Sequence, residues 1–457
     1  MMDLASAAHA MGGRAIGPNR SFEAVATDSR SLAPGDLFFA LRGERFDGHD
    51  FVPAALAHGA AAAVVSRERA GEFAGSLVAV DDPVVALGCL AAVWRARHTL
   101  PLAVVVGSNG KTTVKEMTAA ILREHYGEQA VLATRGNLNN AIGLPVTLLS
   151  LTAQHRAAVI ELGMNHRGET WELCNIARPT IATINNAQRE HQEFMRTVSE
   201  VAAEHGDAIR ALPGGGLAVI NADDPHALRW RDVAAEVGIQ VIAFGLEQRS
   251  DVFGRALLGP RGSELTVATA HGEADLRLSV PGRHMAMNAL AALATGLAAG
   301  SSLPAAIRAL EAFRPVAGRL ATLKSASGAT IIDDSYNANP DSVRAAIDVL
   351  ARVASPRWLV LGDMGEVGVQ GPAFHREIGT CAREAGIERL YATGTLARQS
   401  VEAFGSGATH FTRVDALTQA LAADLVPGVT VLVKGSRFMA MERVVAALTG
   451  QSDAQAH

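Results

Sequence analysis

Short apolar runs that end in polar or glycine residues recur along this 457-residue chain. They are rich in Val, Ile, Leu and Ala, and many precede segments with apolar residues at helical spacing. Uninterrupted apolar runs are typical of strands buried on both faces of a parallel sheet, and the helical segments supply the crossovers. The pattern predicts an α/β protein with strands at 37–41, 63–65, 77–80, 102–106, 158–160, 181–184, 217–220, 358–361 and 430–433.

One hairpin and three helices have local signals of their own. Two alternating runs, 320–324 and 329–333, flank a Ser-Ala-Ser-Gly segment, which predicts an antiparallel hairpin. An Asp-Pro pair at 82–83 predicts a helix start, because aspartate caps free N–H groups and proline lacks one. An Asn-Pro pair at 339–340 predicts another start, and a further helix is expected at 51–58.

The strand predicted at 102–106 runs into a glycine loop, G-S-N-G-K-T-T. Apolar residues then recur at helical spacing, at Val114, Met117 and Ile121. Such a strand–loop–helix unit points backbone N–H groups at one spot with a helix dipole behind them, and that spot attracts phosphate. The lysine can reach the terminal phosphates of a nucleoside triphosphate, and the first threonine can ligate Mg²⁺. The residues predicted to hold the nucleotide are Gly107, Ser108, Asn109, Gly110, Lys111, Thr112 and Thr113.

This loop is shorter than the usual P-loop, G-x-x-x-x-G-K-[ST], because Val105 occupies the first glycine position. A purely structural turn is the alternative, but the strand before the loop and the Lys-Thr pair at its end favour phosphate. A dinucleotide-binding fold would need G-x-G-x-x-G. That motif is absent here, and such a fold would leave Lys111 without a role.

Composition and charge narrow the function classes. At about 100–200 residues per domain, the length predicts roughly three domains, and 49% hydrophobic residues can form sizeable cores. The formal net charge is −5 and no basic block occurs, so a nucleic-acid partner is not expected. The three cysteines lie far apart, and neither a signal peptide nor a membrane span is evident. These features favour a cytoplasmic protein without membrane insertion.

Two further residues are candidates for holding a metal ion. Glu161 closes an apolar strand, where a carboxylate can hold the Mg²⁺ that bridges nucleotide phosphates, or can be a plain surface carboxylate. His191 lies in a polar segment after the strand at 181–184, and without a zinc-like spacing around it a structural histidine is the alternative. Ligands of open parallel sheets bind beyond the carboxyl ends of strands, which is where both residues lie.

Polar segments elsewhere are candidate ligand loops. The segment 134–145 is dense in asparagine and glycine, and 333–342 follows a strand with two acids and an asparagine cluster. A long turn and a helix cap are the respective alternatives. The loop at 28–30 offers groups for a diphosphate, or is an ordinary charged loop. The candidate substrate residues are Ser29, Arg30, Asn137, Asn139, Asn337, Asn339 and Lys434.

Together these segments resemble the Mur ligases of peptidoglycan synthesis over nearly the whole chain. The matching motifs are D-S-R at 28–30, G-D-L-F-F-A-L-x-G at 35–43, G-S-N-G-K-T at 107–112, G-N-x-N-N-x-x-G-x-P at 136–145, E-L-G-M at 161–164, N-A-D-D-P at 221–225, D-x-Y-N-A-N-P-x-S at 334–342, L-G-D-M-G-E at 361–366 and V-K-G-S-R at 433–437. The segment 334–342 is similar to that of the members that add a dipeptide. The D-N-P-R motif of the diaminopimelate-adding members is absent.

The resemblance implies a three-domain Mur ligase architecture. Residues 1–98 are expected to bind a UDP-sugar, 99–315 to form a central P-loop ATPase domain, and 316–457 to form a Rossmann-like domain that closes over both. The implied reaction is ATP-dependent amide formation through an acyl phosphate. Its substrates would be UDP-N-acetylmuramoyl-tripeptide and D-alanyl-D-alanine, its cofactors ATP and Mg²⁺, and its working state a monomer.

The resemblance also implies roles for single residues. Lys111 would contact the transferred phosphate, and Thr112, Glu161 and His191 would serve Mg²⁺, so that Lys111, Glu161 and His191 are the expected catalytic residues. Further nucleotide contacts are implied for Asn288 on the adenine side and for Arg319 and Asp334 at the phosphate and ribose.

Two departures from the family pattern stand out. Val106 replaces the usual threonine before the glycine loop, and the lysine that many relatives carry in carbamoylated form is absent. Ala-Ala-Glu-His at 202–205 occupies that neighbourhood, so Glu204 or His205 is a candidate for holding a second Mg²⁺. Two other functions stay open. One is a sister amide ligase, either a Mur ligase that adds diaminopimelate or lysine or an enzyme of the folylpolyglutamate synthetase type. The other is a non-catalytic, nucleotide-gated binding module.

Overall fold

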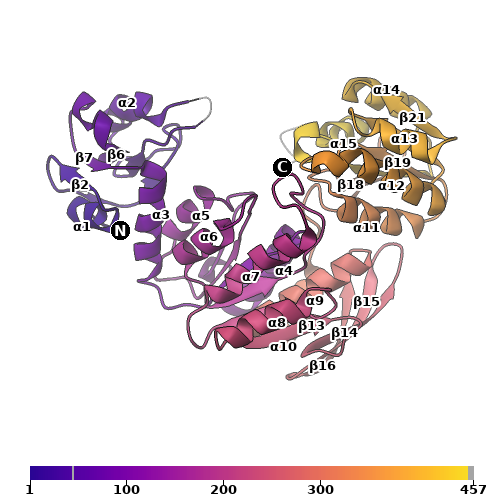
Figure 1. The fold of residues 1–457 in the computed structure, drawn as a ribbon, viewed down its shortest axis with the longest axis horizontal. Coiled ribbons are helices and arrows are strands. Elements are labelled where there is room, and N and C mark those ends of the chain that lie inside the picture. The colour runs from indigo at the N-terminus through magenta and orange to yellow at the C-terminus, as the bar shows by residue number, and fades with distance from the viewer. Residues whose placement is uncertain (44–45, 451–457) are drawn as a thin grey trace.

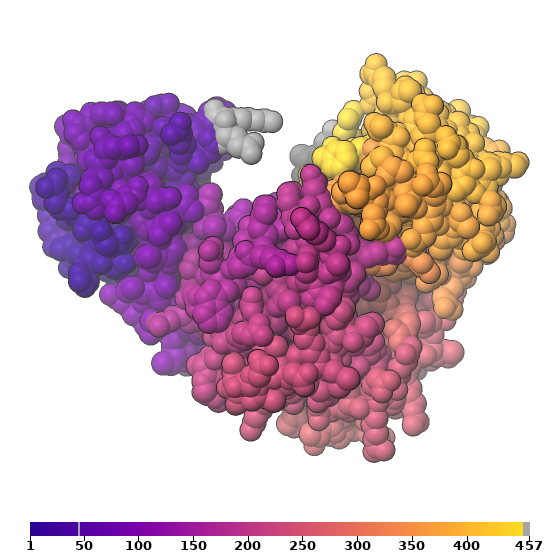
Figure 2. All heavy atoms as spheres, in the orientation of Figure 1, coloured from indigo at the N-terminus to yellow at the C-terminus, as the bar shows by residue number. Residues whose placement is uncertain are grey.

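The computed structural model describes residues 1–43 and 46–450. The chain folds into three lobes, each built on its own β-sheet, and they follow one another in sequence order (Figure 1). The space-filling view shows a broad hollow between the first and third lobes, with the middle lobe beneath it (Figure 2). The predicted α/β class is confirmed.

The first lobe holds a five-stranded sheet in the order β2-β7-β6-β5-β4, in which only β2 is antiparallel to its neighbour. The strands predicted at 37–41, 63–65 and 77–80 are confirmed, with the first one shorter than expected. The elements are β1 (Met2–Asp3), α1 (Leu4–Ala10), β2 (Arg14–Ile16), β3 (Ser21–Phe22), β4 (Val25–Ala26), β5 (Leu37–Phe39), α2 (Val52–Ala57), β6 (Ala62–Ser66), β7 (Leu77–Val80) and α3 (Pro83–Arg95).

Helix α3 joins the first lobe to the second. Its predicted cap is confirmed, since the Asp82 carboxylate accepts hydrogen bonds from the N–H groups of Val84 and Val85 at 2.7 and 3.2 Å. At its other end, the Trp94 indole N–H donates to the carbonyl of Leu151, and the buried Arg95 donates to the carbonyl of Ala177. Buried carbonyls need partners, so these bonds fix the helix on the middle lobe.

The middle lobe is a nine-stranded sheet in the order β16-β15-β14-β13-β12-β11-β8-β10-β9. Strands β8 to β13 are parallel, and β15 and β16 extend the sheet as an antiparallel meander from β14. The predictions for 102–106, 158–160, 181–184 and 217–220 are confirmed. The strands are β8 (Leu102–Val106), β9 (Val131–Ala133), β10 (Ala157–Glu161), β11 (Ile181–Ile184), β12 (Leu217–Asn221), β13 (Gln240–Gly245), β14 (Val252–Leu258), β15 (Ser263–Thr269) and β16 (Gly272–Leu278).

Helices cover both faces of this sheet, which is why β8 is apolar throughout. Ala103 and Val105 pack into one hydrophobic cluster, with residues of α4 (Lys111–Tyr126), α9 (Arg283–Ala298) and α10 (Leu303–Ala312). The alternate β8 residues pack into a second cluster on the other face. That face carries α5 (Gly143–Leu149), α6 (Glu169–Ala177), α7 (Val198–Arg210) and α8 (Ala227–Glu236). The carboxyl ends of the central parallel strands therefore meet at one polar edge.

The third lobe is a six-stranded sheet in the order β17-β18-β22-β19-β20-β21. The predicted hairpin is confirmed, because β17 and β18 pair antiparallel while the other pairs are parallel. The elements are β17 (Ala321–Lys324), β18 (Thr330–Asp334), α11 (Pro340–Ala351), β19 (Arg357–Leu361), α12 (Gly371–Glu384), β20 (Arg389–Thr393), α13 (Arg398–Phe404), β21 (Ala408–Phe411), α14 (Val414–Asp424), β22 (Thr430–Lys434) and α15 (Glu442–Thr449).

Among the described residues, none of the helices combines the length and the apolar composition that crossing a bilayer requires.

Candidate active site

The glycine loop lies at the carboxyl end of β8 and leads directly into α4. Gly107 and Gly110 have φ values of 140° and 81°, a region that glycine adopts without steric cost. At Gly110 the packing adds a second restriction, because a Cβ atom would lie 2.4 Å from the side-chain oxygen of Asn288. The loop is braced from β11, since the N–H of Asn109 donates to the Asn186 side chain at 2.8 Å. The predicted phosphate cradle is therefore fixed in place.

A cavity of about 1100 Å³ opens above this loop and reaches into the third lobe. It collects most of the residues that the sequence singled out, from segments far apart in the chain. Gly107, Ser29 and Arg30 are the predicted site residues that do not line it. Those that do are Ser108, Asn109, Gly110, Lys111, Thr112, Thr113, Asn137, Asn139, Glu161, His191, Asn288, Arg319, Asp334, Asn337, Asn339 and Lys434.

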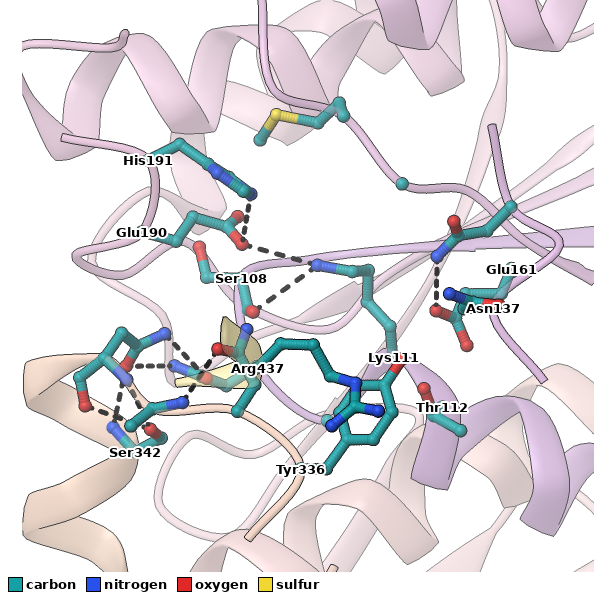
Figure 3. A pocket seen from close by; sticks show the side chains of 18 of the residues that line it. Ser108, Lys111, Thr112, Asn137, Glu161, Glu190, His191, Tyr336, Ser342 and Arg437 are labelled. Carbon is teal, nitrogen blue, oxygen red and sulfur yellow. Dashed lines mark hydrogen bonds and ion pairs between the residues drawn. The ribbon is translucent and has the colours of Figure 1, made fainter. Parts of the chain in front are cut away.

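Lys111 extends from the start of α4 back over the loop, toward Ser108 and Glu190 (Figure 3). Its ammonium donates to the carbonyl of Gly107 at 2.5 Å and lies 3.3 Å from Oε2 of Glu190. Burial alone would raise the pKa of Glu190, but the nearby charge of Lys111 and the imidazoles of His205 and His191 outweigh it and lower this pKa to about 2. Glu190 is therefore an ionised carboxylate in the centre of the site.

Glu161 lies on the opposite side of the Lys111 stem from His191 (Figure 3). Its side chain is buried, and Oε1 accepts a hydrogen bond from the amide of Asn139 at 2.8 Å. Oε2 is also buried but has no hydrogen-bond partner among the described residues. Hard oxygen atoms are the ligands that Mg²⁺ prefers, and the Thr112 hydroxyl belongs to the same cavity. The residues present thus fit a Mg²⁺ ion at this side.

His191 faces two carboxylates from different lobes. Its Nδ1 lies 2.6 Å from Oε2 of Glu366, and its Nε2 lies 3.6 Å from Oε2 of Glu190. A carboxylate on one ring nitrogen fixes the orientation of an imidazole and leaves the other nitrogen to face a ligand. The pKa of Glu366 is lowered, and its hydrogen bond with His191 is the largest cause.

The third lobe contributes residues that are already bound to one another. Lys434 is almost fully buried and forms a 2.6 Å ion pair with Asp334, its register partner across β18 and β22. Burial nevertheless raises the pKa of Asp334. Asn339 both caps α11, accepting from the N–H of Ser342, and donates to the side chain of Asn109 at 2.9 Å. Its helix-cap role, weighed as an alternative, is thus confirmed alongside a contact to the phosphate loop.

Aromatic and cationic groups line the same wall of the cavity. The Arg319 guanidinium lies 4.4 Å from the ring centre of Tyr336, and that of Arg437 lies 5.8 Å from it. Guanidinium groups at this distance are attracted to an aromatic face and are held in position by it. Both arginines line the cavity, and the Arg437 guanidinium also pairs with Glu442 at 2.7 Å.

Sequence reasoning missed Arg189 and Glu190, which carry much of the geometry. Arg189 belongs to the middle lobe, and its guanidinium pairs with two acids of the third lobe, Asp341 at 2.6 Å and Glu377 at 2.8 Å. Hydrogen bonds to Glu377 and Asp341 raise the pKa of Arg189. These partners follow Arg189 by 152 and 188 residues, so no local pattern could have indicated them. The sequence analysis singled out His191 as a metal candidate and did not consider the adjacent Glu190.

The suggestion that Glu204 holds a second Mg²⁺ is wrong in this structure. Both of its carboxylate oxygens accept backbone hydrogen bonds at 2.8 Å, from the N–H groups of Gly168 and Thr170 at the start of α6. Glu204 is a helix cap. His205 is fully buried, and its Nε2 lies 3.3 Å from Oε1 of Glu190. No cluster of three or more His, Cys, Asp or Glu side chains suited to a metal occurs in the described part of the chain.

The loop at 28–30 lies apart from the cavity. The Arg30 side chain is 88% exposed, and its guanidinium pairs with Asp28 at 2.6 Å. Hydrogen bonds to Arg30 lower the pKa of Asp28 to about 2. The diphosphate contact expected for Ser29 and Arg30 stays a prediction, and neither residue lines the cavity at the phosphate loop.

Comparison with known proteins identifies the family. Residues 21–120 match the Mur ligase family catalytic domain, 105–296 the Mur ligase middle domain, and 318–437 the Mur ligase, glutamate ligase domain. A UDP-N-acetylmuramoyl-tripeptide–D-alanyl-D-alanine ligase of Escherichia coli K12 is 40% identical over 440 residues, 96% of each chain. The chain belongs to the Mur ligase family. It is accordingly an ATP-dependent ligase.

Solved structures agree with this assignment. MurF from Acinetobacter baumannii superposes with a TM-score of 0.89 at 33% identity, covering 97% of this chain and 98% of its own. The MurF ligase of Thermotoga maritima in complex with ADP has a TM-score of 0.83 at 26% identity and covers 94% of this chain and 97% of its own. The expected Mur ligase architecture is therefore confirmed.

Proposed function

We propose that this Mur ligase joins D-alanyl-D-alanine to the terminal carboxylate of UDP-N-acetylmuramoyl-tripeptide. The carrying observation is the cavity in which the glycine loop, Glu161, and the strand ends of the third lobe converge. The full-length relatives named for this reaction supply the substrate identities. Adding diaminopimelate, lysine or a folate glutamate is less well supported. The motif at 334–342 is similar to that of dipeptide-adding enzymes, and relatives that match over nearly the whole chain are named for that reaction.

The chemistry must turn a poor electrophile into a good one. A carboxylate attacks the terminal phosphate of ATP and becomes an acyl phosphate, and ADP leaves. The free amine of the dipeptide then attacks the carbonyl carbon, and collapse of the tetrahedral intermediate gives the amide and inorganic phosphate. Charge on the transferred phosphoryl group has to be stabilised and water kept away from the acyl phosphate.

The residues of the cavity divide these tasks. The loop N–H groups from Gly107 to Thr113 bind the phosphates, and the Lys111 ammonium meets the transferred one. Thr112, Glu161 and His191 would hold Mg²⁺, which supplies charge neutralisation for the phosphates. Asn288 would contact the nucleotide on its adenine side, and Arg319 and Asp334 would contact the phosphate and the ribose. All three residues line the cavity, which supports these roles.

The remaining assignments concern substrates and domains. Residues 1–98 would bind the UDP end, with Ser29 and Arg30 at the diphosphate, and 99–315 would bind ATP. Residues 316–457 would close on the nucleotide and the dipeptide, a motion that also excludes water. We expect a cytoplasmic monomer. The side chains proposed to contact the peptide substrates are Asn137, Asn139, Asn337, Asn339 and Lys434, which all line the cavity.

The test is release of inorganic phosphate in reactions that contain ATP, Mg²⁺, the UDP-tripeptide and D-alanyl-D-alanine. We expect release only when both organic substrates are present, and formation of one pentapeptide per phosphate. Replacing the dipeptide with diaminopimelate, lysine or glutamate should stop the reaction. Phosphate release with one of those amino acids, or none with any acceptor, would overturn the proposal.

A further inference from the structure

Glu190 is a buried carboxylate that contacts three basic side chains from three parts of the chain. Its Oε2 lies 3.3 Å from Nζ of Lys111, at the start of α4, and 3.6 Å from Nε2 of the neighbouring His191. Its Oε1 lies 3.3 Å from Nε2 of His205 on α7. Oε1 has no hydrogen bond of good geometry among the described residues, although the side chain is 93% buried.

The two oxygen atoms face different surroundings. Lys111, Glu190 and His191 line the cavity, whereas His205 lies behind them, fully buried and outside the cavity lining. His205 therefore backs the carboxylate from the protein side. The other facing acid near His205 is Asp224, whose carboxylate is occupied by the N–H groups of Ala187 and His226 at 2.8 Å.

The same ammonium cannot serve Glu190 and a nucleotide equally well. In the proposed function Lys111 meets the phosphates, so an arriving polyphosphate competes with Glu190 for it. The phosphates also bring negative charge close to a carboxylate in a partly buried site, where like charges repel more strongly than in water. A cation beside Glu190 and His191 offsets that repulsion.

We propose that Glu190, backed by His205, occupies the place of a phosphate at Lys111 and so makes nucleotide binding depend on Mg²⁺. Glu190 is a positioning residue in this account, because it acts through Lys111 and His191. Glu366 on the far nitrogen of His191 keeps the near nitrogen turned toward Glu190. The inference rests on the proposed contact between Lys111 and the nucleotide phosphates.

The decisive variant is Glu190→Gln, which keeps the shape of the side chain and removes its charge. The measurement is the affinity for a non-hydrolysable ATP analogue by isothermal titration calorimetry, in EDTA and in saturating MgCl₂. We expect the variant to bind the analogue more tightly than the wild type in EDTA, and the gain from Mg²⁺ to fall by about tenfold to a hundredfold. A structural defect would weaken binding in both buffers. An unchanged ratio of the two affinities in the folded variant would overturn the inference.

His205 and Glu204 offer a matched test on one helix. His205→Gln keeps an N–H donor for Glu190, and we expect its affinity ratio to stay close to wild type. His205→Leu has no donor, and its ratio should fall part of the way toward that of Glu190→Gln. Glu204→Gln weakens the cap of α6, so it should lower the melting temperature and leave the ratio unchanged.

The outcomes separate the inference from the proposed function. A wild-type protein that binds the ATP analogue in neither buffer contradicts the nucleotide site itself. Binding with a normal Mg²⁺ gain in Glu190→Gln contradicts only the role of Glu190. A His205→Leu protein with the wild-type ratio contradicts the backing role of His205. A Glu204→Gln ratio that shifts as far as that of Glu190→Gln would show general loosening of the lobe and would also contradict the inference.

Discussion

The sequence predicts anion sites both at the glycine loop of the middle lobe and at the Asp28–Arg30 loop of the first lobe. In the structure, the two loops differ in how firmly the surrounding residues hold them. Beneath the cavity, the glycine loop is held by the buried Asn185 and Asn288 and by the half-buried Asn186. The Arg30 guanidinium extends into solvent, and among the described residues its ion pair is with Asp28, two residues away. The glycine loop is thus formed and braced without a ligand, whereas the Arg30 side chain is not held by the rest of the lobe.

This difference has an energetic meaning. A preformed cradle has lost its conformational freedom during folding, so little is lost again when phosphate binds. An exposed arginine must be ordered at the time of binding, and its contribution is reduced by that cost and by solvent screening. The comparison therefore predicts large effects at the glycine loop and small, substrate-specific effects at Arg30.

The largest effect is expected for Lys111→Ala. It removes the one ammonium assigned to the transferred phosphate, and loss of such a charge-stabilising donor lowers kcat by about 10²- to 10³-fold or more. Phosphate release measures the rate, and titration with the UDP-tripeptide provides the control. We expect affinity for the UDP substrate to stay near wild type. Turnover within about threefold of wild type would contradict the importance given to the preformed site.

A smaller effect is expected for Glu161→Gln. The change keeps an acceptor for Asn139 but removes the charge at the unpartnered Oε2, so Mg²⁺ should bind less well. We expect a loss of at least about 10- to 100-fold in metal affinity or activity, because removal of a mere hydrogen-bond partner of a metal ligand already has an effect of that size. Rates measured over a range of MgCl₂ concentrations should show a higher half-saturating concentration. An unchanged Mg²⁺ dependence would remove Glu161 from the metal site.

Arg30→Ala tests the second loop, that of the first lobe. We expect the KM for the UDP-tripeptide to rise about tenfold, from loss of one charge-assisted contact, while the KM for ATP does not change. Stability should change by less than about 0.5 kcal/mol, because the side chain is exposed. Arg67→Ala is the matched control, since Arg67 is another exposed arginine of this lobe that pairs with an aspartate. Equal effects of the two variants would contradict a specific role for Arg30.

The smallest effect concerns pH and stability. The pKa of Glu190 is lowered to about 2 in the folded chain, below its ordinary value of 4.5, so between these values the unfolded chain binds more protons. Glu190 therefore adds stability as the pH rises from 2 to 4.5, and that stability is lost on acidification through this window. The melting temperature of the wild type should gain a few degrees more between pH 3 and pH 6 than that of Glu190→Gln. Equal gains would contradict the charge assigned to Glu190.

The parts of the fold that could be predicted share a local cause. Strand β8, the cap at Asp82 and the β17–β18 hairpin each depend on a few adjacent residues, and each is present. The strands β14, β15 and β16 were not predicted. Buried and exposed positions alternate along β15 and, toward its end, along β16, so a strand signal was present in these segments and was overlooked.

The sequence could predict those site residues that lie at the carboxyl ends of strands. Topology alone brings Glu161 and Lys111 to one edge, since β10 and β8 are adjacent parallel strands. The contacts across lobes are different, because Arg189 and His191 meet partners that are fixed only when the third lobe docks. Asn339 caps α11 through a local hydrogen bond, but its contact with Asn109 likewise depends on tertiary structure.

The most direct test is a crystal structure of the protein with Mg²⁺ and a non-hydrolysable ATP analogue. We expect the terminal phosphates to lie on the N–H groups of Gly107 to Thr112, with the Lys111 ammonium moved from Glu190 to the γ-phosphate. A nucleotide bound elsewhere, with the glycine loop unliganded, would contradict it.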